Sequence, residues 1–158
     1  MFEIRRATRQ DAQTAFDIRR LAIRAQCIGA YSEEAMLRWT QGSLSEAFSD
    51  LVAAHFYLVC DQGMVIATGM LDVARTEIGA IFVHPDYMGR GIGRLLMAHL
   101  EGLAEAAGLT QITLDATLNA AAFYRSCGFA GDDQGIYHSP SGLQLACVPM
   151  RKALHAQG

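Results

Sequence analysis

Three glycines, Gly89, Gly91 and Gly93, stand two residues apart in the segment Ile81–Arg94, which reads IFVHPDYMGRGIGR. An apolar run typical of a buried strand ends at Val83, and helical periodicity begins at the glycines. Backbone N–H groups at such a strand-to-helix turn point inward, and the helix dipole adds partial positive charge. Glycines let a phosphate approach these N–H groups because no side chain intervenes. The segment therefore predicts a pyrophosphate-binding turn.

Two other phosphate-binding motifs do not fit the residues that follow the glycines. A P-loop needs Lys and then Ser or Thr after its last glycine, where this chain has Arg94 and Leu95. A dinucleotide-binding turn needs Gly or Ala three residues after Gly93, where Leu96 stands. From the glycines alone, the alternatives are another phosphate ligand or a loop that binds none.

A second segment, Leu114–Phe129, reads LDATLNAAAFYRSCGF. Together the two segments resemble the GNAT superfamily, the Gcn-related N-acetyltransferases. The acyl-CoA motif of that family is Gln/Arg-x-x-Gly-x-Gly/Ala after a strand ending in Val-x-Pro, and residues 88–93 read MGRGIG after VHP. Its downstream motif is Asn-x-x-Ala-x-x-x-Tyr-x-x-x-Gly-Phe, which is matched here by Ala120, Tyr124, Gly128 and Phe129. The resemblance covers residues 55–150 well and residues 1–54 only in outline.

The resemblance implies that acetyl-CoA binds as a co-substrate, without a metal. Two motif positions differ from the family pattern: Met88 replaces Gln or Arg, which predicts weaker phosphate contact, and Thr117 replaces Asn. Asn119 lies two residues out of register. The cofactor-binding residues that the resemblance implies are Ile81, Phe82, Val83, Met88, Gly89, Arg90, Gly91, Ile92, Gly93, Arg94, Thr117, Asn119 and Tyr124.

The resemblance also implies direct attack of a primary amine on the thioester within a ternary complex. A backbone N–H near Val83 would polarise the thioester carbonyl. Tyr124 matches the tyrosine that protonates the departing CoA thiolate, and a phenol with a pKa of about 10 carries that proton at neutral pH. The alternative role for Tyr124 is that of an amphipathic packing residue.

An ammonium acceptor with a pKa of about 10.4 must lose a proton before it can attack. Glu77 is the candidate general base, because family members often place a base on the strand that leads to the phosphate-binding turn. In a regular strand Glu77 would share one face with Gly79, Ile81 and Val83. The alternative is a solvated carboxylate at a strand end.

Other candidates carry weaker signals. His84 borders the turn, where it is either a titrating group or a loop histidine with its hydrogen bonds satisfied. Asp72 and Asp115 interrupt apolar strands and are expected near the acceptor cleft. Glu33 and Glu34 would attract a cationic acceptor, but they also fit the acidic start of a helix.

The elements that must position these residues follow from hydrophobic periodicity. Strands are predicted over 2–7, 55–60, 64–74, 77–84, 111–117, 136–138 and 143–154. Helices are predicted from Thr8 to about Cys27 and over 32–39, 91–107 and 120–126, with another turn or two within 43–51. This order predicts an α/β domain whose mixed central sheet of about six to seven strands is flanked by about four helices.

Composition excludes several classes of protein. The net charge of −3 with no Lys/Arg stripe argues against nucleic-acid binding. No apolar stretch approaches the ~20 residues that cross a bilayer, and the charged N-terminus does not fit a signal peptide. Four dispersed cysteines without a CxxC pair argue against a zinc site and favour reduced thiols. We therefore expect a cytoplasmic protein.

The 158 residues fit a single domain. The resemblance divides it into acceptor-side helices (1–54), a cofactor-binding core (55–107) and a C-terminal half (108–158). It implies an N-acetyltransferase acting on a small-molecule or peptide amine, with homodimerisation through the apolar run LQLACVPM as one form of assembly. The alternatives are a non-catalytic CoA-binding module of the same fold and a nucleotide-phosphate binder.

Overall fold

The computed structural model describes residues 2–139 and 142–155, and it is built on a seven-stranded sheet of order β1-β2-β3-β4-β5-β7-β6. Neighbouring strands run antiparallel except β4 and β5, which run parallel. The strands are β1 (Phe2–Arg6), β2 (Phe56–Asp61), β3 (Met64–Asp72), β4 (Glu77–Val83), β5 (Gln111–Ala116), β6 (Gly135–His138) and β7 (Gln144–Ala153). The predicted mixed α/β sheet is confirmed.

Five α-helices accompany the sheet in the described part of the chain: α1 (Ala12–Gln26), α2 (Glu33–Thr40), α3 (Glu46–His55), α4 (Ile92–Ala106) and α5 (Ala121–Ser126). Two short 3₁₀ turns, η1 (Arg9–Asp11) and η2 (Pro85–Tyr87), precede α1 and α4. Helix α3 is longer than the predicted turn or two, and the Ser45 hydroxyl caps it by accepting the Phe48 N–H at 3.1 Å. Within the described residues, no helix has the length and apolar character needed to span a membrane.

Strand β4 contains a bulge that controls the direction of every side chain after it. The flanking pairs with β3 are Met70–Gly79 and Thr68–Phe82, so two residues of β4 lie opposite one residue of β3. Ala80, in the bulge, has φ of +51°. This left-handed conformation costs a residue with a Cβ about 1–2 kcal/mol. The fully buried Thr68 hydroxyl donates to the Ala80 carbonyl at 2.9 Å and so satisfies an acceptor at the irregularity.

Because of the bulge, the prediction that Ile81 and Val83 share a face of β4 with Glu77 and Gly79 is wrong. Ile81 and Val83 pack into the core cluster that includes α4, whereas Ala80 packs against the cluster beneath α3. Glu77 therefore does not share a face with Ile81 and Val83. An extra residue reverses the alternation of a strand, and Gly79, just before Ala80, is its one local signal in the sequence.

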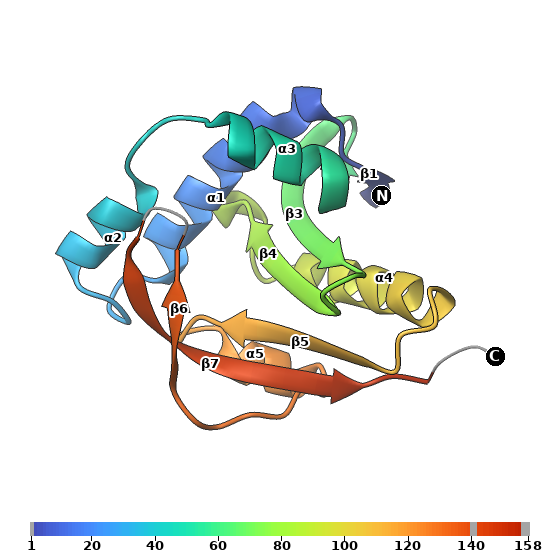
Figure 1. The fold of residues 1–158 in the computed structure, drawn as a ribbon. Helices are drawn as coiled ribbons and strands as arrows, with labels where there is room; N and C mark the ends of the chain where they lie inside the picture. The colour runs from blue at the N-terminus through green and yellow to red at the C-terminus, as the bar shows by residue number, and fades with distance from the viewer. Residues whose placement is uncertain (1, 140–141, 156–158) are drawn as a thin grey trace.

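Strands β4 and β5 pair at a single register position, Glu77 with Thr113, and separate beyond it. Figure 1 shows the two strands diverging toward the side of the molecule where α1 and α2 lie. The inner edges of both strands thus lack the sheet hydrogen bonds that continued pairing would provide. The resulting gap lies between the two halves of the sheet.

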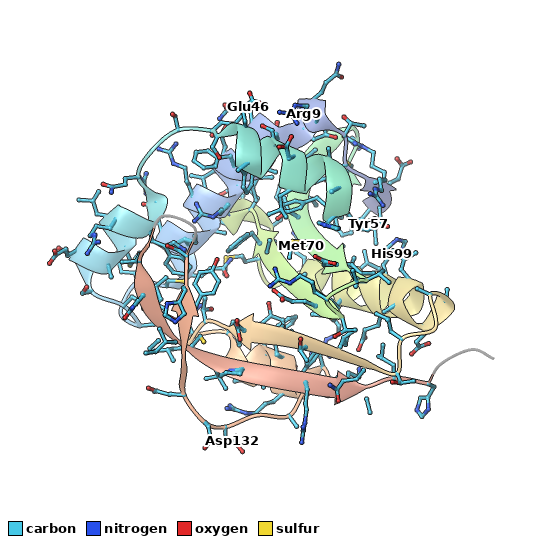
Figure 2. The ribbon with its side chains drawn as sticks, viewed as in Figure 1. Arg9, Glu46, Tyr57, Met70, His99 and Asp132 are labelled. Atoms are coloured by element: carbon cyan, nitrogen blue, oxygen red, sulfur yellow. The ribbon has the colours of Figure 1, made fainter. Side chains whose placement is uncertain are left out.

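Helices α4 and α5 cover one face of the sheet, and α1 and α3 cover the other (Figure 1). Gly69 permits the close approach of α4 to β3, because a Cβ there would lie 2.8 Å from Leu96 and 2.9 Å from Ile81. On the opposite face, Met70 lies between α3 and β4 (Figure 2) and packs near Gly79. A side chain at position 69 would force the Leu96 and Ile81 side chains to move.

The N-terminal helices also contact the second half of the sheet. Trp39 of α2 packs with Leu143 and with Leu145 of β7. The Tyr31 hydroxyl, between α1 and α2, donates to the Ala146 carbonyl at 2.6 Å and accepts the Leu118 N–H at 3.1 Å. These contacts span the gap and hold the diverging strands apart at a set width.

We expect Thr68→Val, which keeps the shape of the side chain but removes the hydroxyl, to lower the free energy of unfolding by about 1–3 kcal/mol, because the Ala80 carbonyl loses its partner. Urea denaturation measures this change. Thr68→Ser retains the hydroxyl and should lose clearly less stability. Equal losses in both variants would mean that the bond does not support the bulge.

Candidate active site

The predicted pyrophosphate-binding turn lies between β4 and α4. Gly89 and Gly91 both adopt left-handed conformations, with φ of +78° and +77°, and no atom lies within 4 Å of a Cβ built on either. The first-turn N–H groups of α4 have no partner within the helix, and no side chain in the described part of the chain caps that end. The turn thus presents an open row of backbone donors at a helix N-terminus, as an anion site requires.

Gly93 differs from the other two glycines. It belongs to the first turn of α4, and a Cβ there would lie 3.3 Å from the Phe123 ring. Arg94, the next residue, donates to the Ser126 hydroxyl at 2.9 Å and lies over the Phe123 ring. Both residues therefore join α4 to α5 in the structure, and Ile92 is buried in the core.

Side chains from η2 and α1 surround the turn. The Arg90 guanidinium stacks over the Tyr87 ring at 5.2 Å. Met88, at the position where the family motif has Gln or Arg, is 46% exposed and accepts from the Gln26 amide at 3.3 Å. The same amide donates to the Val83 carbonyl at 3.4 Å. Gln26 thus places a polar amide beside position 88, where this chain has the apolar Met88 instead of Gln or Arg.

The inner edge of β4 presents backbone groups to the gap. The His84 N–H donates to Ile66 of β3 at 2.8 Å. Because N–H directions alternate along a strand, the Val83 N–H points to the opposite edge, away from β3. This is the donor that the sequence predicts for a thioester carbonyl. The His84 ring accepts the Asp86 N–H at 3.1 Å, which fits the loop-histidine alternative.

A narrow cavity of about 80 Å³ lies in the gap and is lined by Tyr124. Residues 78–82 of β4 form one wall, and Cys27, Thr117, Asn119 and Ala120 are among the others. Tyr124 is 8% exposed and lies edge-on to the rings of Phe123 and Phe129. Burial raises the pKa of the Tyr124 phenol above its ordinary value, so the hydroxyl keeps its proton at neutral pH.

Cys27 brings the end of α1 to the predicted cofactor residues after β5. Burial raises the pKa of the Cys27 thiol to about 11, and hydrogen bonding with Thr117 and Asn119 partly opposes the increase. The thiol is therefore neutral near pH 7 and is a poor nucleophile. Thr117 and Asn119, which the sequence predicts as cofactor-binding residues, line the narrow cavity together with Cys27, which the sequence did not single out.

A wider cavity of about 250 Å³ adjoins the narrow one, since both are lined by residues 78–80, Phe82, Asp115 and Thr117. Five lining residues come from the first 54 positions: Arg19, Tyr31, Trp39, Phe48 and Leu51. The remaining residues include Phe56, Met70, Glu77, Tyr137, Leu145, Ala146 and Cys147. A groove of about 550 Å³ over β5 and β7 also includes Glu77 and Asp115.

Glu77 stands where β4 and β5 begin to diverge, at the edge of the wider cavity. Burial raises the pKa of its carboxyl, Arg75 opposes the shift, and the negative charges of Asp115 and Asp72 add to it. Asp115 lies in this cavity as expected, whereas Asp72 lies 3.6 Å from His55 and is absent from the lining. A half-buried carboxylate with a raised pKa has the properties of a general base.

Three residues of the wider cavity were missed by the sequence: Arg19, Tyr31 and Tyr137. Arg19 lies on an amphipathic helix with many charges, and Tyr31 and Tyr137 lie next to glycine-containing turns, so none stands out by spacing. Within the described residues, no three His, Cys, Asp or Glu side chains are grouped as metal ligands would be.

Comparisons with known proteins agree with this geometry. The family model of the acetyltransferase (GNAT) domain matches residues 52–130. The peptidyl-lysine N-acetyltransferase YjaB of Salmonella typhimurium is 28% identical over 131 residues, which cover 82% of this chain and 83% of that protein. The chain spans only about a third of the ycf52 N-acetyltransferase of Porphyra purpurea, with 36% identity over 56 residues.

Two solved structures extend the comparison. A GCN5-related N-acetyltransferase from Rhodopseudomonas palustris superposes with a TM-score of 0.88 and 30% identity, covering 96% of this chain and 95% of that one. The PaiA N-acetyltransferase of Thermoplasma acidophilum, solved in complex with coenzyme A, has a TM-score of 0.70 and 16% identity over 97% and 99% of the two chains. With both motifs, the divided sheet and the family model in agreement, the chain belongs to the GNAT family of N-acetyltransferases.

Proposed function

We propose that the protein transfers an acetyl group from acetyl-CoA to the primary amine of a small molecule or peptide by direct attack in a ternary complex. The observation that carries the proposal is the gap between β4 and β5, which has a glycine-rich donor row at one end and two adjoining cavities. Tyr124 lines the narrow cavity, and Glu77 lines the wide one.

The residues at the turn fit the pyrophosphate of acetyl-CoA. Gly89 and Gly91 leave open space where a Cβ would stand, so the phosphates can approach the N–H groups at the start of α4. The Arg90 guanidinium supplies further donors nearby. The chain therefore holds the co-substrate mainly through its backbone, which explains how Met88 is accommodated in the motif.

The chain's own groups would act on the thioester in two ways. The Val83 N–H would stabilise the negative charge that develops on the carbonyl oxygen as the amine attacks. The Tyr124 phenol would give its proton to the CoA thiolate as the carbon–sulfur bond breaks. The phenol is protonated at neutral pH, as this role requires, and burial raises the Tyr124 pKa further above its ordinary value.

Glu77 would accept the proton of the ammonium, directly or through water. An ammonium has a pKa near 10.4 and a free glutamate carboxyl one near 4.3, so a carboxylate is a weak base for this proton. Burial raises the pKa of the Glu77 carboxyl and so narrows the difference between the two pKa values. Its place beside the wide cavity supports entry of the acceptor there, opposite the pyrophosphate-binding turn. The name of the YjaB relative makes a peptide lysine one acceptor to include in any screen.

Two other functions predict different outcomes. A non-catalytic CoA-binding module would bind acetyl-CoA and release no CoA with any amine. A nucleotide-phosphate binder would be protected against heat by ATP or NAD more than by CoA.

Tyr124→Phe should lower kcat at neutral pH by about 10-fold or more, because the thiolate then leaves without a proton. Acetyl-CoA affinity, measured by calorimetry, should stay unchanged. Tyr57→Phe, on β2 next to His99 (Figure 2), is the matched control and should retain full kcat. An unchanged kcat for Tyr124→Phe would remove the residue from the mechanism.

Gly91→Glu should abolish acetyl-CoA binding, because the side chain would fill the turn and repel phosphate. Gly102→Glu adds the same charge at an exposed position of α4 and should bind normally. Calorimetric titration of both variants measures the effect, with thermal melting to verify folding. Undiminished binding by a folded Gly91→Glu protein would contradict the phosphate site.

Glu77 should impose an ascending limb on the pH profile of kcat/KM, since a base acts only when deprotonated. The midpoint of that limb should lie above the ordinary glutamate pKa because burial raises the Glu77 pKa. Glu77→Gln should lower the rate by about 10²–10⁴-fold and flatten the limb. Glu105→Gln, at a partly exposed position of α4 that lines neither cavity, is the control. A Glu77→Gln profile that keeps the same limb would assign it to another group.

A further inference from the structure

Arg19 of α1 lines the wide cavity without a carboxylate partner among the described residues. Within residues 2–139 and 142–155 its one hydrogen bond joins Nη2 to the Trp39 carbonyl at 3.2 Å, and its guanidinium lies 6.0 Å from the centre of the Phe16 ring. Other arginines form ion pairs: Arg5 with Asp11, Arg9 with Glu46 and Asp50, and Arg125 with Asp132. Arg19 is therefore a cation at a cavity wall with most of its donors unused.

Burial of the Arg19 charge has a free-energy cost that Tyr137 and the Trp39 carbonyl offset only in part. It lowers the pKa of the Arg19 guanidinium, although the group remains charged at neutral pH. A half-buried guanidinium gains most from an anion that accepts two parallel N–H bonds, as a carboxylate does. A bound acceptor that carries such an anion would complete the hydrogen bonding of Arg19.

Glu77 and Asp115 bring negative charge to the same cavity, and within the described residues neither forms an ion pair with Arg19. Tyr137 lies within electrostatic reach of all three: Arg19 favours its ionised form, while Asp115 and Glu77 oppose it. The cavity therefore has a cationic part and an anionic part, with a phenol close to both. A molecule bearing an amine and a carboxylate matches this division of charge.

The rest of the cavity restricts the size and polarity of the acceptor. Its volume is about 250 Å³, slightly below the 300–1,000 Å³ typical of drug-sized ligands. Between the charged groups the walls are largely aromatic and aliphatic, and they include Trp39, Phe48, Phe82 and Met70. An apolar side chain of a small molecule would be buried against them.

We infer that the acceptor is a free amino acid with an apolar side chain, whose carboxylate binds Arg19 while its amine lies toward Glu77. This inference rests on the proposed acetyltransferase function and adds its substrate class. Arg19 is then a specificity-determining residue that positions the amine. A phosphate-bearing amine would share the anion chemistry, but the apolar walls favour a carboxylate on an apolar body.

The test is CoA release from acetyl-CoA by the full chain with matched amines. Leucine, methionine and phenylalanine are each compared with their amides and their decarboxylated amines, which differ only at the carboxylate. A lysine-containing peptide, a polyamine and glucosamine 6-phosphate complete the panel. At least one of the three amino acids should exceed its amide and its decarboxylated amine in kcat/KM by about 30-fold or more, because these lack a bidentate partner for Arg19.

Arg19→Gln should remove this preference by lowering kcat/KM for the amino acid about 30-fold or more, with little change for the decarboxylated amine. Arg19→Lys keeps the charge without the planar fork and should recover part of the loss. Arg20→Gln is the matched control on α1, since Arg20 stacks on Phe16 outside the cavity lining. Thermal melting verifies that each variant folds.

Three outcomes would overturn the inference while leaving the acetyltransferase proposal standing. In the first, the amides or decarboxylated amines react with the same kcat/KM as the amino acids. In the second, the peptide, the polyamine or the sugar phosphate is the best acceptor. In the third, Arg19→Gln keeps the preference for the amino acid. CoA release with none of these amines, despite acetyl-CoA binding, would instead contradict the proposed function, and the acceptor inference would fall with it.

Discussion

The separation of β4 from β5 beyond the Glu77–Thr113 pair is the constraint on which the active site depends. Backbone hydrogen bonds that would have continued the sheet are given up, and the inner edges of the strands face a gap. Contacts from outside the sheet keep the gap open: Tyr31 bonds to Ala146 and Leu118, and Trp39 packs against the segment that carries β7. In the proposed function, the substrates bind at edges that a continuous sheet would have sealed.

The bulge in β4 lets residues before it and after it face opposite sides of the sheet. Before the bulge, Glu77 and Gly79 line the wide cavity. After it, Ile81 and Val83 pack against α4 and α5, so the strand is anchored beside the pyrophosphate-binding turn. Ala80 adopts the unfavourable left-handed conformation of the bulge, and the hydrogen bond from the buried Thr68 hydroxyl to its carbonyl partly offsets the free-energy cost. A regular strand would have directed Glu77, Ile81 and Val83 to the same side.

The acceptor half of the site is built differently from the cofactor half. The turn at Gly89–Gly91 and the N–H at Val83 use the backbone, which any sequence of suitable conformation provides. The wide cavity uses side chains from α1, α2, α3, β6 and β7, whose positions depend on packing between distant segments. Arg19 illustrates the difference, because only the approach of α1 to β4 makes it part of the proposed acceptor cavity.

Periodicity, turn chemistry and short motifs are local properties, so the amino-acid sequence was enough to predict the order of elements, the glycine-rich turn and the family. It also singled out Glu77 and Tyr124, since each lies at a recognisable place in a strand or motif. The tertiary structure decided which way Ile81 and Val83 point, since the bulge depends on pairing with β3. It also decided which N-terminal residues meet Glu77 and Asp115. Long-range packing brings those side chains together, and spacing along the chain carries no record of it.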